Sequence, residues 1–393
     1  IIEPSCSPYN SNPLLVSKDS DQSKRFVVDF RLLNKNTIPD TYPLPSVDEL
    51  VDQTLGCKFF TQLDLASGYW TVPISEDHCH KTAFSVPRGK YQFKRMPFGL
   101  KNAQATFQRY MDSIVEEMKK LGAEGVDAYV DNIIISSKSF DEHMRSLNIV
   151  LSVLDKHHMS LRRDKCEFAV REMEFLGFSI DGETVKPGAK NLDKIKDFPT
   201  PTSRKELQRF LGIANYNRRF IDGYSLLTAP LNRLTSTKVP FVWTKSEQTA
   251  FEKLKLAFHE ALQLYIPDWS KPFVIRTDAS SVAVGRVLGQ YDDDGSFRPV
   301  GYHSETLNKN TKNWSATEKE LYAIISASRK WKPYCYEKIT FYSDHEPLRS
   351  IHKQKDPRGK IGRWIMELEN LDYSIKYLKG VDNQEADYLS RNC

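Results

Sequence analysis

Apolar residues recur at steps of three and four positions in two stretches of the first half of the chain. The first stretch carries Phe107, Tyr110, Met111, Ile114, Val115 and Met118 on one face. The second runs roughly from Asp141 to His157 and carries Leu147, Val150, Leu151 and Leu154. This period is typical of amphipathic helices whose apolar face packs on a sheet. We therefore expect a sheet covered by two helices in this part of the chain.

A third helical pattern follows Thr200-Pro201-Thr202-Ser203, a segment typical of a helix start. Its apolar stripe consists of Leu207, Phe210, Leu211 and Ala214. Its other face is basic and consists of Arg204, Lys205, Arg209, Arg218 and Arg219. Two interpretations stay open for this basic face: it grips nucleic acid, or it is an ordinary solvated helix face.

From Pro267 onward the pattern changes to alternating strands and helices. Three segments predict strands: Phe273–Asp278, Ile339–Asp344 and Tyr373–Tyr377. Ser315-Ala316-Thr317-Glu318 predicts a capping box that opens a helix. On that helix, one face is shared by Glu320, Ile324, Ala327 and Trp331, and a later helix is predicted at Arg363–Leu368. Asp278 and Asp344 therefore end two predicted strands, and Glu320 faces the sheet from a predicted helix.

A tight hairpin is predicted at Tyr129-Val130-Asp131-Asn132, because this segment lies between apolar runs. A second apolar run, which begins at Phe59, ends in Asp64. Carboxylates are the ligands that Mg²⁺ prefers in proteins. The hairpin tip and the end of the second run are therefore candidate metal ligands.

Six further segments occur in an order that, with the hairpin, resembles the gypsy-type (Metaviridae) reverse transcriptases of LTR retrotransposons. They are Ile2-Glu3-Pro4-Ser5, Val28–Lys35, Tyr42-Pro43-Leu44-Pro45, Arg95–Ala103, Phe175-Leu176-Gly177 and Phe210–Tyr216. The resemblance implies α+β and α/β domains: a right-hand polymerase with fingers, palm and thumb, then a ribonuclease H-like domain. We expect fingers and palm in residues 1–188, thumb and connection helices in 189–265, and ribonuclease H in 266–393.

The resemblance also implies roles in polymerisation. Asp64, Asp131 and the backbone carbonyl of Leu65 would hold metal, and Asn132 stands where the family has a second Asp. Tyr69 matches the family's steric gate against ribonucleotides. The other expected substrate contacts are Lys18 and Arg25 for the triphosphate, Phe98 and Gly99 for the nucleotide pocket, and Phe175, Leu176 and Gly177 for the primer end.

In the last domain, the resemblance carries over a set of four acids: Asp278, Glu320, Asp344 and Asp387. Two Mg²⁺ ions per active site are the implied cofactors, with Mn²⁺ as the alternative. The chain also departs from the family's pattern at Asn132, Gln104, Arg286 and Tyr388. We expect Arg286 and Tyr388 to disturb the packing of the nuclease domain, and Asn132 to impair polymerisation without abolishing it.

Composition adds less. The 393 residues, 40% of them hydrophobic, suit two or three domains, and the net charge of +5 permits a phosphate-binding groove. The six cysteines include no C-x-x-C pair, which favours a reducing compartment. We interpret His78-Cys79-His80 as a surface segment rather than a metal cluster. No apolar stretch is long enough to span a membrane. A chain that begins with Ile is expected to be a piece of a polyprotein.

The leading hypothesis is an RNA- and DNA-templated DNA polymerase with ribonuclease H activity, from an LTR retrotransposon polyprotein. Its expected partners are RNA/DNA hybrids, duplex DNA and dNTPs, with a homodimer on substrate suggested by the family. We expect it in the cytoplasm, within a virus-like particle. The alternative, motivated by Asn132, is a domesticated or polymerase-deficient binding module for nucleic acid or protein on the same fold.

Overall fold

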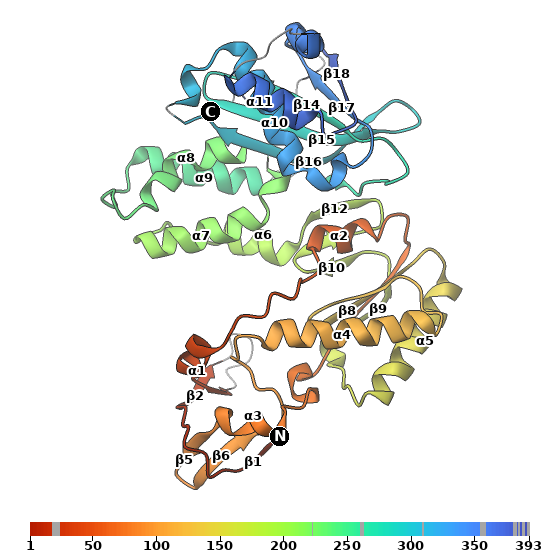
Figure 1. The fold of residues 1–393 in the computed structure, drawn as a ribbon, viewed down its shortest axis with the longest axis vertical. Helices are drawn as coiled ribbons and strands as arrows, with labels where there is room; N and C mark the ends of the chain where they lie inside the picture. Colours follow the sequence, from red (N-terminus) through yellow and green to blue (C-terminus); the bar gives the residue numbers. More distant parts are fainter. Residues whose placement is uncertain are drawn as a thin grey trace. The chain divides into compact units, whose positions relative to one another are not determined.

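The computed structural model describes residues 1–17, 24–221, 223–259, 263–308, 310–353 and 359–379, together with 383, 386 and 390. The chain divides into two compact units, Ile1–Met173 and Glu174–Cys393 (Figure 1). Within the described ranges, no helix combines the length and the apolar character needed to cross a membrane.

An antiparallel sheet of four strands, in the order β7-β8-β4-β9, forms the centre of the first unit. Its strands are β4 (Phe59–Asp64), β7 (Val126–Tyr129), β8 (Asn132–Ser137) and β9 (Glu167–Val170). The two predicted helices are confirmed as α4 (Ala103–Lys120) and α5 (Phe140–Lys156). The prediction is wrong for Leu151, which is exposed although it was placed on the apolar face of α5. Apolar residues of both helices and of the sheet share one buried core, which makes the strand ends a rigid platform.

The rest of the first unit is built from short elements. A three-stranded sheet is formed by β1 (Ile2–Pro4), β6 (Gly89–Phe93) and β5 (Phe84–Val86), and a hairpin by β2 (Pro13–Ser17) and β3 (Lys24–Val28). The helices are α1 (Arg31–Asn36), α2 (Val47–Asp52) and α3 (Glu76–Cys79). The interpretation of His78-Cys79-His80 as a surface segment is wrong for Cys79. This side chain is buried because α3 turns its thiol toward the carbonyls of Ile74 and Ser75.

The second unit begins with a sheet in the order β10-β11-β12-β13 and a group of four helices. The strands are β10 (Met173–Phe175), β11 (Phe178–Ile180), β12 (Thr184–Pro187) and β13 (Leu264–Tyr265). The helices are α6 (Ala189–Lys196), α7 (Arg204–Tyr216), α8 (Tyr224–Leu234) and α9 (Lys245–His259). Helix α7 confirms the predicted start, since its N-cap Ser203 accepts a hydrogen bond from the Glu206 backbone. Its predicted apolar stripe is buried.

The predicted basic face of α7 is only partly present, because Arg218 and Arg219 lie in a separate short 3-10 helix (Arg218–Phe220) that follows it. Arg204 donates hydrogen bonds to the carbonyls of Leu234 and Val239, at 3.1 and 2.5 Å, and so ties α7 to the end of α8 and the loop after it. Lys205 and Arg209 are exposed. Arg204 therefore has a structural role, which leaves only part of the predicted face open to solvent.

The remainder of the second unit is a five-stranded sheet in the order β16-β15-β14-β17-β18. Its strands are β14 (Val274–Ala279), β15 (Ala283–Tyr291), β16 (Phe297–Thr306), β17 (Ile339–Ser343) and β18 (Tyr373–Tyr377). Pairing is parallel between β14, β17 and β18 and antiparallel between the others. Helices α10 (Ala316–Lys330) and α11 (Gly359–Leu368) pack on it, and the capping box of Ser315 and Glu318 is confirmed.

The structure accommodates Arg286 without the disturbance expected from the sequence. Its side chain is only 1% exposed and pairs with Glu305 at 2.7 Å, and the Tyr322 hydroxyl donates to the same carboxylate at 2.7 Å. Burial, with the nearby Arg286 charge, lowers the pKa of His303 to about 3, so that this imidazole is neutral. The buried cation is thus compensated within the sheet. Tyr388 lies outside the described residues.

Candidate active sites

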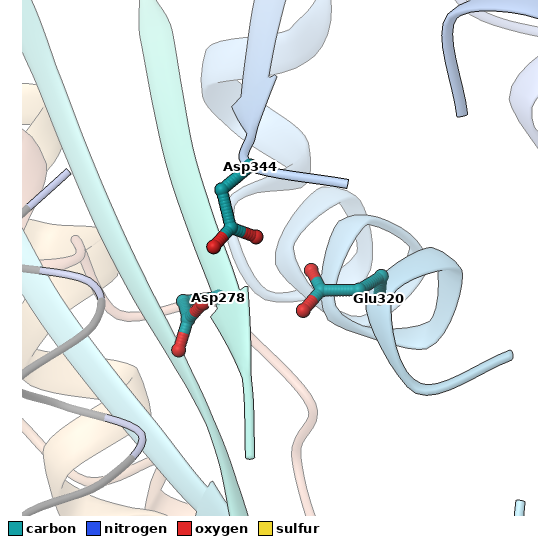
Figure 2. A group of neighbouring side chains, drawn as sticks. All are labelled: Asp278, Glu320 and Asp344. Atoms are coloured by element: carbon teal, nitrogen blue, oxygen red, sulfur yellow. The ribbon is translucent and has the colours of Figure 1, made fainter. Parts of the chain in front are cut away.

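Three carboxylates converge at the carboxyl ends of β14 and β17, two neighbouring strands inside the five-stranded sheet. Asp278 is in β14, Glu320 is in α10, and Asp344 follows the last residue of β17. One oxygen from each lies within 4.8 Å of the others, and Figure 2 shows the three side chains directed toward a common point. Within the described parts of the chain, this is the one group of at least three acids, histidines or cysteines placed to hold a metal ion.

Hydrogen bonds fix the buried members of this cluster. The Ala279 backbone N–H donates to Glu320 Oε1 at 3.0 Å, and the Ser343 hydroxyl donates to Oε2 at 3.1 Å. The Ser390 hydroxyl donates to Asp278. The predicted fourth acid, Asp387, lies outside the described residues. Ser343 and Ser390 were not anticipated, because a serine beside an acid carries no distinctive sequence signal.

Electrostatics make this cluster receptive to a cation. Burial, followed by the negative charges of Asp278 and Asp344, raises the pKa of Glu320 to about 8. Without a cation, Glu320 therefore keeps its proton at neutral pH. A divalent ion between the three carboxylates would offset their repulsion, and oxygen donors suit Mg²⁺ or Mn²⁺. The residues present therefore fit such an ion.

The other predicted site is at the hairpin between β7 and β8. Its two-residue loop is Val130-Asp131, and Val130 has a φ of 54°, which a β-branched residue rarely adopts. The buried Gln108 of α4 supports this loop: Val130 N–H donates to its Oε1 at 2.7 Å, and its Nε2 donates to the Ala128 carbonyl at 3.0 Å. Its sequence signal was a polar residue on an apolar helix face, three positions before Met111.

Strand pairing brings the candidate polymerase acids together. Asp64, the last residue of β4, lies directly opposite Asn132 in β8, and Leu65 N–H donates to the Asp131 carbonyl at 2.9 Å. The Asn132 amide lies between two neighbours: Gln62 Nε2 donates to its Oδ1 at 3.3 Å, and its Nδ2 donates to Asp131 Oδ1 at 3.5 Å. Asn132 thus occupies the position across from Asp64 without adding a charge.

Asp64 has a cationic neighbour that the sequence did not reveal. Arg162 Nε lies 2.8 Å from Asp64 Oδ1, an ion pair that lacks hydrogen-bond alignment. Burial raises the pKa of Asp64, and the charge of Asp131 adds to this effect, whereas Arg162 and Lys165 oppose it. Arg162 is separated from Asp64 by most of the first unit in sequence, so that only the folded chain reveals the pair.

Aromatic residues surround the predicted steric gate. The Tyr69 ring lies 5.2 Å from that of Phe98 and 5.1 Å from that of Phe107, measured between centroids. Burial and the charge of Asp131 raise the pKa of the Tyr69 hydroxyl. The carbonyl of Gly99 accepts a hydrogen bond from Asn34 at 2.8 Å. The structure thus brings Tyr69 and Phe98 together. Arg25 lies in β3 with only its backbone described, and Lys18 lies outside the described residues.

The predicted primer-end segment forms the turn between β10 and β11. Leu176 and Gly177 both have positive φ, of 49° and 82°, which Gly177 adopts without strain. The Tyr216 hydroxyl donates to the Leu176 carbonyl at 2.6 Å, and Asn191 Nδ2 donates to that of Gly177 at 3.1 Å. Phe175 is fully buried and supports the turn from the core. An open pocket of about 450 Å³ adjoins the turn.

Two family patterns match the chain. Residues 16–180 match the family described as reverse transcriptase (RNA-dependent DNA polymerase), and residues 268–371 match the RNase H-like domain found in reverse transcriptase. Among curated proteins, the retrovirus-related Pol polyprotein from transposon 297 of Drosophila melanogaster is 40% identical over all of this chain. The transposon Tf2-7 polyprotein of Schizosaccharomyces pombe is 37% identical over 97% of it. The chain spans only 37% and 29% of the lengths of these two relatives.

Solved structures give the same picture of the fold. The foamy viral protease-reverse transcriptase in complex with dsDNA has a TM-score of 0.86 and 25% identity, over 96% of this chain and 79% of that one. The same viral protein in complex with RNA/DNA hybrid has a TM-score of 0.80 and 25% identity, over 96% and 51%. Both units of this chain therefore have counterparts in a viral enzyme.

The raised pKa of Glu320 predicts how the stability of the metal-free protein depends on pH. Above the ordinary value of 4.5 the unfolded chain releases this proton, whereas the folded protein keeps it up to about pH 8. The free energy of unfolding should therefore fall as pH rises through this window. Glu320→Gln should flatten that fall. Denaturant titrations with a chelator, monitored by circular dichroism at several pH values, measure both slopes. The exposed Glu337→Gln is the matched control, and an unchanged slope in Glu320→Gln would contradict the assignment.

Proposed function

We propose that this chain, which belongs to the gypsy-type reverse transcriptase family of LTR retrotransposon Pol polyproteins, polymerises DNA on RNA and DNA templates and cleaves the RNA strand of RNA/DNA hybrids. The convergence of Asp278, Glu320 and Asp344 is the observation that carries the proposal. The three carboxylates repel one another unless a cation or a proton is bound. Such a group is more typical of a metal-binding or catalytic site than of a purely structural domain.

The nuclease reaction needs activation of water and stabilisation of a departing oxygen, which two Mg²⁺ ions, or Mn²⁺ in their place, would supply when bound. Asp278, Glu320 and Asp344 would hold the ions, with Asp387 as the fourth ligand. The hydrogen bonds from Ala279 and Ser343 would keep the Glu320 carboxylate in one orientation during this step. Contacts to ribose 2′-hydroxyls would restrict cleavage to the RNA strand.

At the polymerase site, Asp64 and Asp131, with the Leu65 carbonyl, would hold the metal, which would supply electrostatic stabilisation for the addition of a dNTP to the primer 3′-hydroxyl. Asn132 would contribute as a neutral neighbour. Lys18 and Arg25 would neutralise the triphosphate of the dNTP. The turn at Leu176 and Gly177, backed by Phe175, would position the primer end. The fixed carbonyls of this turn and the strained Val130 both support a precise placement of reacting groups.

Tyr69 would select the sugar, with Phe98 and Gly99 lining the nucleotide pocket. Its packing against Phe98 and Phe107 supports this role, because a ring held on two sides cannot move away from a 2′-hydroxyl. We further assign fingers and palm to residues 1–188, thumb and connection helices to 189–265, and ribonuclease H to 266–393. The protein would act on hybrid and duplex DNA as a homodimer within a virus-like particle.

Asn132 favours one second candidate, a polymerase-deficient binding module on the same fold. An amide binds Mg²⁺ more weakly than a carboxylate does. Primer extension on an RNA template, with cleavage of a hybrid measured beside it, separates the two candidates, since a polymerase-deficient binding module would not extend the primer.

Asp344→Asn should abolish cleavage of the RNA strand and leave hybrid affinity largely unchanged. Removing one charge weakens ion binding at the cluster, whereas affinity for the duplex comes mainly from phosphate contacts elsewhere. A labelled hybrid measures cleavage by gel and affinity by anisotropy at the same salt concentration. The exposed Asp293→Asn is the control for the same chemical change. Undiminished cleavage by Asp344→Asn would remove the nuclease assignment.

Tyr69→Ala should raise the incorporation of ribonucleotides relative to deoxyribonucleotides, because the smaller side chain leaves room for a 2′-hydroxyl. Single-nucleotide incorporation kinetics with matched rNTP and dNTP give the ratio of kcat/KM values. Tyr69→Phe keeps the ring and is the control, for which the ratio should stay near that of the parent. If the ratio is the same in all three proteins, Tyr69 belongs to the core and not to a gate.

Asn132→Asp should increase primer extension, most clearly at limiting Mg²⁺, because a third carboxylate beside Asp64 and Asp131 strengthens ion binding. Ribonuclease H cleavage by the same preparation is the internal control and should not change. The Mg²⁺ dependence of extension is measured at fixed ionic strength. No gain in Asn132→Asp, together with no loss in Asp131→Asn, would favour the binding module.

A further inference from the structure

We infer that Arg162 serves as an internal cation for Asp64 in the metal-free polymerase site and that a divalent ion must compete with it. The inference rests on the proposed function in one respect, since it takes Asp64 to be a metal ligand. Arg162 contacts this candidate metal ligand directly, because its Nε lies 2.8 Å from Asp64 Oδ1.

Backbone pairing places Arg162 beside Asp64. The Arg162 N–H donates to the Asp64 carbonyl at 2.9 Å, and Leu161 forms an isolated bridge with Leu65. Arg162 is therefore held in register with the end of β4, and its side chain starts next to the carboxylate that it contacts. The side chain of Asp64 is 14% exposed and that of Arg162 is 36% exposed, so water screens the pair only in part.

The charges around Asp64 explain why a fixed cation matters here. Asp131 and Asp164 are nearby negative charges that act on Asp64, and Arg162 and Lys165 are nearby positive charges that act on it. A guanidinium stays protonated at physiological pH, so the positive charge beside Asp64 is permanent. Because Asn132 contributes no charge, the local balance is less negative than a site with three carboxylates would have. Arg162 and Asn132 thus both weaken the attraction of the site for a divalent ion.

The competition has two measurable consequences. Without metal, Arg162 should stabilise the fold, since its removal leaves a partly buried carboxylate uncompensated. When metal is added, the loss of the Arg162 guanidinium should tighten ion binding, because the ion no longer competes with a positive charge beside Asp64. A residue that only oriented Asp64 for the ion would have the opposite effect on ion affinity.

The test is made in the full chain with Glu320→Gln and Asp344→Asn, so that metal binding reports on the polymerase site. Isothermal titration with Mn²⁺ and thermal unfolding with and without Mn²⁺ compare this parent with Arg162→Gln. We expect Arg162→Gln to bind Mn²⁺ about fivefold more tightly, as removal of one nearby cation from a partly screened site implies. It should also unfold at a lower temperature than the parent when metal is absent, and gain more stability when metal is added.

Two variants keep the test specific. Arg163→Gln removes the same charge from the adjacent exposed position and should leave Mn²⁺ affinity nearly unchanged. Arg162→Lys keeps the charge and should stay close to the parent. Equal effects of Arg162→Gln and Arg163→Gln, or weaker Mn²⁺ binding by Arg162→Gln, would overturn the inference. Failure of the proposed function is a separate result: the unsubstituted chain would then extend no primer at saturating Mn²⁺, whatever the binding data show.

Discussion

Repulsion between carboxylates that the fold holds together is the constraint on which both candidate sites depend. At the carboxyl ends of β14 and β17, oxygens of Asp278, Glu320 and Asp344 lie within 4.8 Å of one another, and two of the three side chains are buried. Such an arrangement costs free energy unless a cation or a proton is bound. Rigid β pairing, the packed helix α10 and the hydrogen bonds to Glu320 hold the carboxylates together despite this repulsion. The chemistry proposed for the site follows from the same arrangement, because a cluster that repels itself attracts divalent ions.

Both sites place aspartates at or just beyond the ends of paired strands. Asp64 ends β4 and Asp278 lies near the end of β14, while Asp131 and Asp344 lie just outside β8 and β17. Interior strand residues are fixed by ladder hydrogen bonds, and a residue one step beyond the ladder keeps that precision while its side chain reaches a ligand. The surrounding apolar cores then keep the carboxylates from moving apart.

The sequence predicted the parts of this design that depend on local pattern. The helices, the capping box at Ser315 and the strands that carry Asp278 and precede Asp344 are confirmed, because periodicity and caps report burial and helix ends directly. The supporting contacts of Gln108 and Arg162 were missed. Each joins residues far apart in the chain, and a polar residue in a sequence does not identify its partner. Arg204 shows the same limit: it belongs to a basic helix face, yet its guanidinium binds backbone carbonyls.

The two sites relieve their repulsion by different means, and this difference has a functional consequence. In the nuclease cluster the relief is a proton on Glu320, whose pKa of about 8 makes ion binding compete with protonation near neutral pH. At the polymerase site the relief comes from the positive charge of the Arg162 guanidinium, whose Nε lies 2.8 Å from Asp64 Oδ1. Ion binding by the nuclease cluster is thus coupled to pH, whereas ion binding beside Asp64 competes with a fixed charge. Under the proposed function, the two reactions of this chain would therefore depend on the same metal in different ways.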